Sequence, residues 1–338
     1  MRHDPTLAQR RSSKRHFLKR LSAVSALPAL ATLAATPACA EGTFPDRPLK
    51  IVVNFSAGGP LDILARVMAE KMQQTLKQTV IVENQTGAAG NIGARSVANA
   101  APDGYTLLFS IDTPFTLSPS VYKQMPFSAT ALEPVALLGS STLTVAVNPA
   151  TGIDSLQALI RKSKNRAVSF SSAGQGSPGH IAALMLAEAT GMRINHIPYR
   201  GNAPAVVALL SGEVEAGILS TSGLIPQIQA HSLLPLAVAG STRSALLPAL
   251  PTVTELGYPG LELEFLFLAM LPRDTPDAIR QTLRKAMMDA LSQPAIRTRL
   301  EQLDILASDL SAAELDKKLE AMRANYSRII KAHRLQMD

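Results

Sequence analysis

Nine short apolar segments recur along this 338-residue chain, and helical patterns separate many of them. Segments of this length suit buried strands, whereas buried helices need longer ones. Strands that alternate with helices build layers in which helices cover a mainly parallel sheet. The chain is therefore expected to be an α/β protein. The predicted strands are residues 49–55, 79–83, 106–110, 143–147, 168–171, 195–199, 215–219, 234–238 and 265–271.

Three helices have clear sequence signals. One begins near Pro60 and places an apolar stripe on a single face. A second is expected to start at Thr275, with Pro276 in its first turn. A third starts at Ser311, because Glu314 stands at the spacing of a capping box. The stripe of the first helix consists of Leu64, Val67, Met68, Met72 and Leu76.

The formal charge of +7 is concentrated at one end of the chain. The first 40 residues hold seven of the 33 basic side chains and one of the 26 acidic ones, so the remainder carries 26 bases and 25 acids. Binding driven by phosphate neutralisation needs a clustered basic surface, and the remainder offers none. Nucleic acid is therefore excluded as a partner. The seven bases are Arg2, Arg10, Arg11, Lys14, Arg15, Lys19 and Arg20.

The same 40 residues have the three-part layout of an export signal. A basic stretch ends at Arg20, an apolar stretch covers residues 21–35, and small residues precede Glu41. Cleavage after Ala40 to give an exported, periplasmic protein is the main prediction, with a lipid anchor at Cys39 as the alternative. Residues 13–19 approximate a twin-arginine signal, so the general secretory and twin-arginine routes are both open. Cys39 is the single cysteine of the chain, which excludes disulfides and thiol catalysis after cleavage.

One pattern occurs twice, about 115 residues apart. A strand runs into a tight turn of small residues and then into a helix, first at Ser56, Ala57, Gly58 and Gly59 and again at residues 172–177. A helix N-terminus carries unpaired N–H groups and a positive dipole end, which suits a carboxylate or phosphate. Hydroxyls of Ser56, Ser172 and Ser177 can add donors. Two lobes that each present a helix end to one anion are therefore predicted, although the glycines can equally serve the turns alone.

Other chemistries have little support. Gly174, Gly176 and Gly179 match a dinucleotide fingerprint, but the acidic residue expected after the next strand is missing, so we expect no cofactor. Ser177 lacks the surroundings of a nucleophile elbow. No histidines stand at zinc-ligand spacing, so no metal is expected. His180, at the start of the second helix, either touches a ligand or has an ordinary capping role.

Seven segments in order resemble the substrate-binding proteins of tripartite tricarboxylate transporters, the Bug family. The resemblance covers essentially everything after the export signal, and seven ordered matches are more specific than any single glycine motif. The matching segments are residues 44–53, 55–66, 82–93, 101–106, 171–180, 198–204 and 250–260.

The resemblance implies a type II periplasmic binding protein, a monomer with two α/β lobes that close on a small carboxylate. Lobe one would comprise residues 44–143 and 270–338, lobe two residues 144–269, and residues 143–147 and 265–271 would cross between them. The ligand would be held by loops matching Phe55 to Asp62 and Ser172 to His180, with contacts near Thr113, Ser220 and Thr221. Membrane permease subunits of the transporter would be the partner.

Several positions depart from the family pattern near the expected ligand. Asn54 and Ala57 replace prolines, Leu219 and Ser220 stand where Phe-Asp is common, and Leu266 stands near a usual tryptophan. Asn54 would add a polar group to the first loop, and Leu266 would remove an aromatic surface.

The roles of three charged residues stay open. Asp62 either stabilises the first helix end or binds a ligand amine, hydroxyl or water. Arg66 is expected to pair with Asp62 one turn earlier in the helix. Arg200 either attracts an anion from a distance or lies on the surface without such a role.

The expected function is capture and delivery of a small carboxylate without catalysis. Closure would follow because the second lobe completes the ligand contacts only in the closed form. A sensor that contacts a membrane signalling protein and an exported enzyme remain as alternatives.

Overall fold

The computed structural model describes residues 44–308 and 310–332. The export signal, its cleavage site at Ala40 and Cys39 lie outside these residues. Within the described part, no helix is long and apolar enough to cross a membrane. The strands of this part are β1 (Leu49–Val53), β2 (Val80–Asn84), β3 (Thr106–Ile111), β4 (Leu132–Val147), β5 (Val168–Ser172), β6 (Ile194–Pro198), β7 (Ala216–Ser220), β8 (Leu234–Val238) and β9 (Glu264–Pro272).

Helices follow most of the strands, as the alternating pattern predicts. Three short 3₁₀ turns, η1 (Ala88–Gly90), η2 (Ala129–Ala131) and η3 (Pro149–Thr151), lie between the longer elements. The α-helices are α1 (Pro60–Leu76), α2 (Asn91–Ala98), α3 (Thr113–Thr116), α4 (Ser118–Val121), α5 (Leu156–Asn165), α6 (Pro178–Thr190), α7 (Asn202–Leu210), α8 (Thr221–Gln229), α9 (Asp277–Leu291), α10 (Pro294–Glu301) and α11 (Ala312–Ala332).

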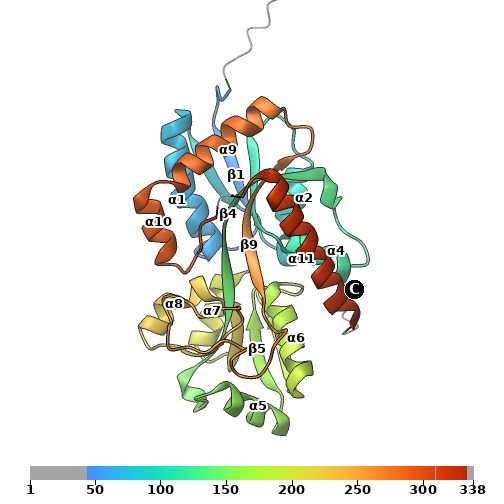
Figure 1. The fold of residues 1–338 in the computed structure, drawn as a ribbon, viewed down its shortest axis with the longest axis vertical. Helices are drawn as coiled ribbons and strands as arrows, with labels where there is room; N and C mark the ends of the chain where they lie inside the picture. Colours follow the sequence, from blue (N-terminus) through green and yellow to red (C-terminus); the bar gives the residue numbers. More distant parts are fainter. Residues whose placement is uncertain (1–43, 309, 333–338) are drawn as a thin grey trace, which may run out of the picture. The chain divides into compact units, whose positions relative to one another are not determined.

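The strands form one path in the order β2-β1-β3-β9-β4-β7-β5-β6, and β8 pairs with β4 beside it. The outer trios β2-β1-β3 and β6-β5-β7 are parallel, whereas all pairs that involve β4 or β9 are antiparallel. We call β1–β3 and β9 with α1–α4 and α9–α11 lobe one, and β5–β8 with α5–α8 lobe two. Figure 1 shows β4 running between these two groups.

Strand β4 is the largest difference from the sequence prediction, which placed a strand at residues 143–147 only. The observed strand begins at Leu132. Pro134 and Gly139 argue against a strand there, but the register of β4 against β9 shifts at both positions, between Pro134 and Ala136 and between Leu137 and Gly139. Irregularities of this kind accommodate proline and glycine in a strand.

The other eight strands are confirmed within two residues at each end. The apolar stripe of α1 is also confirmed, because Leu64, Met68 and Met72 are buried and the rest of the stripe packs against the core. Ser311 and Glu314 form the capping box, with both reciprocal bonds present. A helix does begin in the predicted segment, since α9 starts at Asp277, but the capping role of Thr275 is wrong: the N-cap is Pro276, and the Thr275 hydroxyl donates to the Pro272 carbonyl.

The pairing partners show where the chain passes between the lobes. Thr142 of β4 is in register with Glu264 of β9, and Leu143 is in register with Ser220 of β7. The amide of Leu263 donates to Ala239 beside β8. Because β9 pairs with β3 from Phe267 to Met270, we propose to move the second lobe boundary from residues 269/270 to 263/264. The remaining boundaries stay predictions.

One apolar core continues through both lobes. A single cluster of buried side chains includes Val53 and Phe109 in lobe one and Phe170 and Ile218 in lobe two. Side chains from β9 join it at the crossing, where Phe265 and Phe267 are buried. The loops that follow β1 and β5 are therefore placed by a shared, packed scaffold.

Candidate functional site

The loop between β1 and α1, which we call loop one (residues 54–59), is held by the carboxylate of Asp62. Asp62 is 3% exposed and accepts hydrogen bonds from the Gly58 amide at 2.9 Å and the Asn84 amide group at 2.9 Å. Arg66 donates to both carboxylate oxygens, at 3.0 and 2.9 Å. The predicted Asp62–Arg66 pair is therefore confirmed. With four donors inside the protein, Asp62 positions loop one, and we propose no ligand contact for it.

The ionisation of Asp62 fits this role. Burial opposes the charged carboxylate, but hydrogen bonds from Arg66, Gly58 and Asn84 outweigh burial and lower the pKa of Asp62. A carboxylate that accepts several hydrogen bonds is favoured in its charged form. Asp62 therefore places a buried negative charge at the positive end of α1, directly after loop one.

The loop between β5 and α6, which we call loop two (residues 173–177), is held by neutral groups. The hydroxyl of Ser177 is the N-cap of α6 and accepts from the His180 amide at 3.3 Å. The hydroxyl of Ser172 accepts from the Gly174 amide at 3.2 Å and contacts Nε2 of His196 at 2.7 Å. The Gly176 amide donates to Nδ1 of His180 at 3.1 Å.

Two imidazoles stack beneath loop two. The rings of His180 and His196 lie 3.9 Å apart at 12°. Burial, followed by the neighbouring His196, lowers the pKa of His180 to about 4, and burial lowers that of His196 to about 4. Both rings are therefore neutral at pH 7. The two histidines are 16 residues apart in the sequence and form no recognisable motif. They come together because His196 of β6 is in register with Phe170 of β5, the strand that precedes loop two and α6.

Some loop amides are already used by the protein. Gly59 donates to the Ser56 carbonyl, and Ser177 donates to the Gly174 carbonyl. Pro60 and Pro178 at the helix starts have no N–H to offer. Among the described residues, no acceptor is present for the amides of Ala57 and Gln175. The amides of Leu61 and Gly179, the second residues of α1 and α6, also have no acceptor among the described residues, so each helix end keeps an unpaired donor as the sequence pattern predicts.

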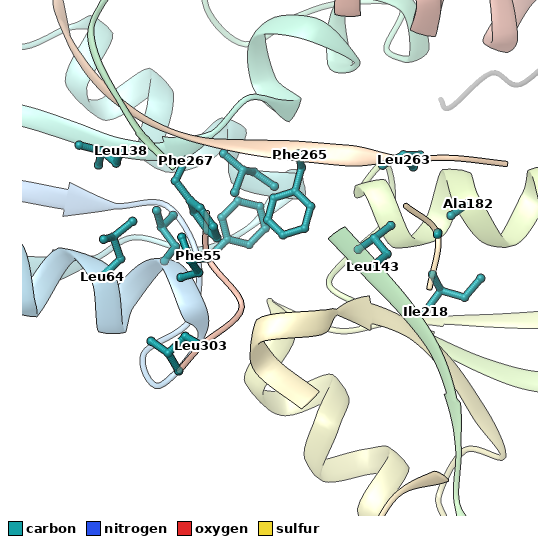
Figure 2. Packing of buried hydrophobic residues seen from close by; sticks show 14 of the residues in the cluster. Phe55, Leu64, Leu138, Leu143, Ala182, Ile218, Leu263, Phe265, Phe267 and Leu303 are labelled. Carbon is teal, nitrogen blue, oxygen red and sulfur yellow. The ribbon is translucent and has the colours of Figure 1, made fainter. Parts of the chain in front are cut away.

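An inner cavity of about 50 Å³ lies where the two loops and the crossing strands meet. Its wall is almost entirely apolar. Figure 2 shows Phe55, Phe265 and Phe267 gathered together, with Leu143 and Ile218 on the lobe-two side. Other lining residues include Gly59, Leu61, Ile111, Ala173, Asn202, Leu219 and Ser220. Among its described lining residues, none is Lys, Arg or His.

An outer cavity of about 320 Å³ shares Phe55 and Ala173 with the inner one. Lobe one contributes Gly87–Gly90 and Tyr122, and lobe two contributes Gly174, Gln175 and Pro198 to Arg200. Ala88 and Ala89 have φ values of 48° and 51°, a left-handed conformation that residues with a Cβ rarely adopt. Such strain often occurs at ligand sites. The residues of η1 were not singled out for a site from the sequence, since nothing there indicates a left-handed turn of alanines.

The two lobes touch around these cavities. The Tyr122 hydroxyl donates to the Gln175 carbonyl at 3.2 Å. A Cβ placed on Gly201 would lie 2.9 Å from the Ser56 nitrogen, so Gly201 packs directly on loop one. A Cβ on Gly174 would lie 4.0 Å from the Ala89 nitrogen. Loop one therefore approaches Gly201 of lobe two, and loop two approaches Tyr122 and Ala89 of lobe one.

The predicted site residues separate into two groups. Phe55, Gly59, Gly174 and Ser220 line one of the cavities. The others support the loops or lie behind them, and their ligand contacts stay predictions. Ser56, Ala57 and Gly58 belong to loop one, and Ser172, Gly176, Ser177 and His180 hold loop two in place. The Thr221 hydroxyl is hydrogen-bonded to Thr142 and Thr144 of β4. Thr113 begins α3, and its buried hydroxyl has no partner among the described residues.

Two departures from the family pattern act differently than expected. Asn54 is fully buried, and its amide group donates to the Gly90 carbonyl at 3.0 Å and to Ser110 at 2.7 Å. It therefore ties β1 to η1 and adds no exposed polar group to loop one. Leu266 belongs to a separate apolar cluster away from the cavity, whereas its neighbours Phe265 and Phe267 line the cavity. The aromatic surface predicted to be missing is present.

Residues 64–335 match the family model "Tripartite tricarboxylate transporter family receptor". The chain belongs to this family. Protein BugT of Bordetella pertussis is 38% identical over 266 residues, which cover 78% of this chain and 81% of BugT. These values agree with the resemblance inferred from seven segments.

Solved structures support the same assignment. The periplasmic binding protein BugD has 32% identity and a TM-score of 0.83, with 87% of this chain and 100% of BugD covered. MatC from Rhodopseudomonas palustris, with bound malate, has 27% identity and a TM-score of 0.81, with 85% of this chain and 100% of MatC covered. The α/β periplasmic binding protein fold is thereby confirmed. As a receptor of this transporter family, the chain is a solute-binding protein and not an enzyme.

Proposed function

We propose that this receptor captures a small carboxylate between its lobes in the periplasm and delivers it to the membrane subunits of a tripartite tricarboxylate transporter. The observation that carries the proposal is the meeting of two strand–turn–helix loops, one from each lobe, at a shared pair of cavities. The malate bound by MatC supports a carboxylate ligand. The protein would act as a monomer, after removal of its leader at Ala40.

Closure on the ligand would account for the glycines where the lobes meet. Gly201 and Gly174 allow lobe two to approach loop one and η1 at backbone distance. A ligand that contacts both lobes favours the closed form by its differential affinity for that form. Delivery then requires reopening at the permease.

Calorimetry on the purified protein tests the proposal. Mono-, di- and tricarboxylates, aromatic acids and acidic amino acids should include at least one ligand that also raises the thermal unfolding temperature. Binding of uncharged compounds alone would contradict a carboxylate receptor.

A variant tests the closure step. Gly201→Ala places a Cβ against Ser56, so we expect affinity for the identified carboxylate to fall at least about tenfold, or about 1.4 kcal/mol. Gly152→Ala is the matched control, because Gly152 also has a positive φ but nothing within 4 Å of the added Cβ. Equal affinities of the two variants would refute a closed form that depends on this contact.

A further inference from the structure

We infer that a cavity behind the crossing strands controls how readily the lobes open, because opening of the ligand cleft would close this rear cavity. The rear cavity has a volume of about 320 Å³ and lies between the loop that follows β8 and the helix α11. The inference rests on the closure step of the proposed function and concerns a different part of the molecule.

Strand alternation places the rear cavity and the inner cavity on opposite faces of the crossing strands. Successive side chains of a strand point to opposite faces. Along β9, Glu264 lines the rear cavity and its neighbour Phe265 lines the inner one. Along β4, Thr142 lines the rear cavity and its neighbour Leu143 lines the inner one. A rotation about these strands that widens one side therefore narrows the other.

The two walls of the rear cavity belong to different lobes and carry side chains of different size. Lobe two contributes the small residues Gly240, Ser241 and Thr242, whereas lobe one contributes the larger Leu306 and Tyr326. Leu306 is 65% exposed in this structure. An approach of the two walls would remove its apolar surface from water, which is favourable. Burial of Leu306 would thus stabilise the open form.

A hydrogen bond ties the loop that follows β8 to lobe one. The Ser244 hydroxyl in this loop donates to the carboxylate of Asp304 at 2.8 Å. Two residues later, Leu306 exchanges two backbone hydrogen bonds of 2.9 Å with Ser140 of β4. The bond to Asp304 opposes separation of the rear walls, so movement of the walls toward each other is the easier direction.

Relatives of the chain differ in overall arrangement. A TctC solute-binding protein from Polaromonas, solved with no ligand, is 26% identical and has a TM-score of 0.62, with 86% of this chain and 100% of that protein covered. MatC with bound malate has nearly the same identity, 27%, and a TM-score of 0.81. The present structure, whose lobes touch at Tyr122 and Gln175, is therefore closer in arrangement to MatC than to the Polaromonas protein.

The balance between the two forms would set the affinity for the ligand. A ligand that binds the closed form alone has an apparent dissociation constant equal to the intrinsic one divided by the closed fraction. Burial of Leu306 in the open form lowers that fraction. The rear cavity would therefore adjust the affinity without any contact with the ligand.

Pulsed electron paramagnetic resonance on the unliganded protein tests the inference. Spin labels at Ser96→Cys in lobe one and Ala189→Cys in lobe two, both exposed positions, report the distance between the lobes, and Cys39→Ser removes the native thiol. With the rear cavity unaltered, we expect a longer and a shorter distance. Ser241→Trp fills the cavity and should lower the ratio of the longer to the shorter form at least about fivefold. Ser232→Trp, at an exposed serine between α8 and β8, should leave the ratio unchanged.

A second variant removes the apolar surface of the rear cavity. Leu306→Ser should lower the same ratio about threefold, because less apolar area is buried on opening. Val207→Ser is its control, since Val207 is 63% exposed on α7 and does not line the rear cavity. If Ser241→Trp does not fold, Leu306→Ser decides.

Three results would overturn the inference: an unchanged ratio in Leu306→Ser, a ratio that rises in either cavity variant, or a single distance when the rear cavity is unaltered. Because no ligand is present, these results are independent of the carboxylate screen. Failure of every carboxylate to bind would refute the proposed function, whereas an unchanged distance ratio would refute the rear-cavity inference alone.

Discussion

Loop one and loop two have the same strand–turn–helix plan but are held by opposite chemistry. Loop one is held by the charged carboxylate of Asp62, the third residue of α1, which accepts hydrogen bonds from the Gly58 amide, the Arg66 guanidinium and the Asn84 side chain. In loop two, hydroxyls of Ser172 and Ser177 and two neutral imidazoles satisfy the turn. The N-cap of α1 is Gly59, without a side-chain bond, whereas the N-cap of α6 is Ser177.

The difference indicates how one receptor can hold two similar turns without placing two charges in one cleft. The negative charge of Asp62 is balanced by Arg66 within lobe one. Loop two adds no charge of its own, so it can approach loop one and an anionic ligand without repulsion. We therefore expect the two loops to respond to acid in different pH ranges.

The largest expected effect is the acid sensitivity of loop two. The unfolded histidines take up protons below about pH 6.5, whereas folded His180 and His196 stay neutral down to about pH 4. The unfolded state thus binds more protons in this window, so the free energy of unfolding falls as the pH falls from 6.5 to 4. We expect a loss of about 3 kcal/mol from His180 and a smaller loss from the more exposed His196, measured by urea unfolding at stepped pH.

Matched histidine variants isolate this effect. His196→Gln removes one titrating ring and should lower the slope between pH 6.5 and 4 by less than half. His231→Gln, at an exposed position between α8 and β8, should leave the slope unchanged. An unaltered slope in His196→Gln would show that the stacked pair does not control acid stability.

The second-largest expected effect is the loss of stability when the carboxylate that holds loop one is removed. Asp62→Ala removes the acceptor of Gly58, Asn84 and Arg66 and should cost about 2 kcal/mol at pH 7, because hydrogen bonds to a charged group are lost in a buried place. The lowered pKa of Asp62 means that its stabilisation is present above about pH 4 and is lost as the pH falls further. Unfolding of the variant should therefore depend less on pH below about pH 4.

Arg66→Ala is the control for that change. The Arg66 side chain is 53% exposed, so its pair is screened by water and should contribute less than about 1 kcal/mol. If Arg66→Ala destabilises the protein as much as Asp62→Ala, the ion pair rather than the amide contacts holds loop one.

The fold was predictable because its signals are local. Short apolar runs, the stripe on α1 and the capping box at Ser311 each depend on neighbouring residues, and each agrees with the structure. The first part of β4 was missed since its proline and glycine lie at register shifts that only the partner strand reveals.

The site was predictable in outline and less so in detail. Both loops were found from glycines and serines, but the sequence did not show that Asp62 and His180 accept from the Gly58 and Gly176 amides, because these contacts depend on the three-dimensional structure. The stacking of His180 on His196 and the left-handed turn at Ala89 depend on strand register and packing, which no local pattern encodes. The polarity of the cavity walls likewise could not be predicted from the sequence and was seen only in the structure.

The smallest effect tests whether the neutral cap of loop two serves the ligand or only the helix. Ser177→Ala deprives the His180 amide of its acceptor and should cost about 1 kcal/mol in urea unfolding. Ser155→Ala removes an equivalent cap, the acceptor of the Ala158 amide at the start of α5, and should cost about the same. Only Ser177→Ala should also weaken carboxylate binding, by about threefold, because loop two lines the outer cavity and Ser155 does not. Equal ligand affinity in both variants would mean that Ser177 stabilises α6 without ordering the turn that faces loop one.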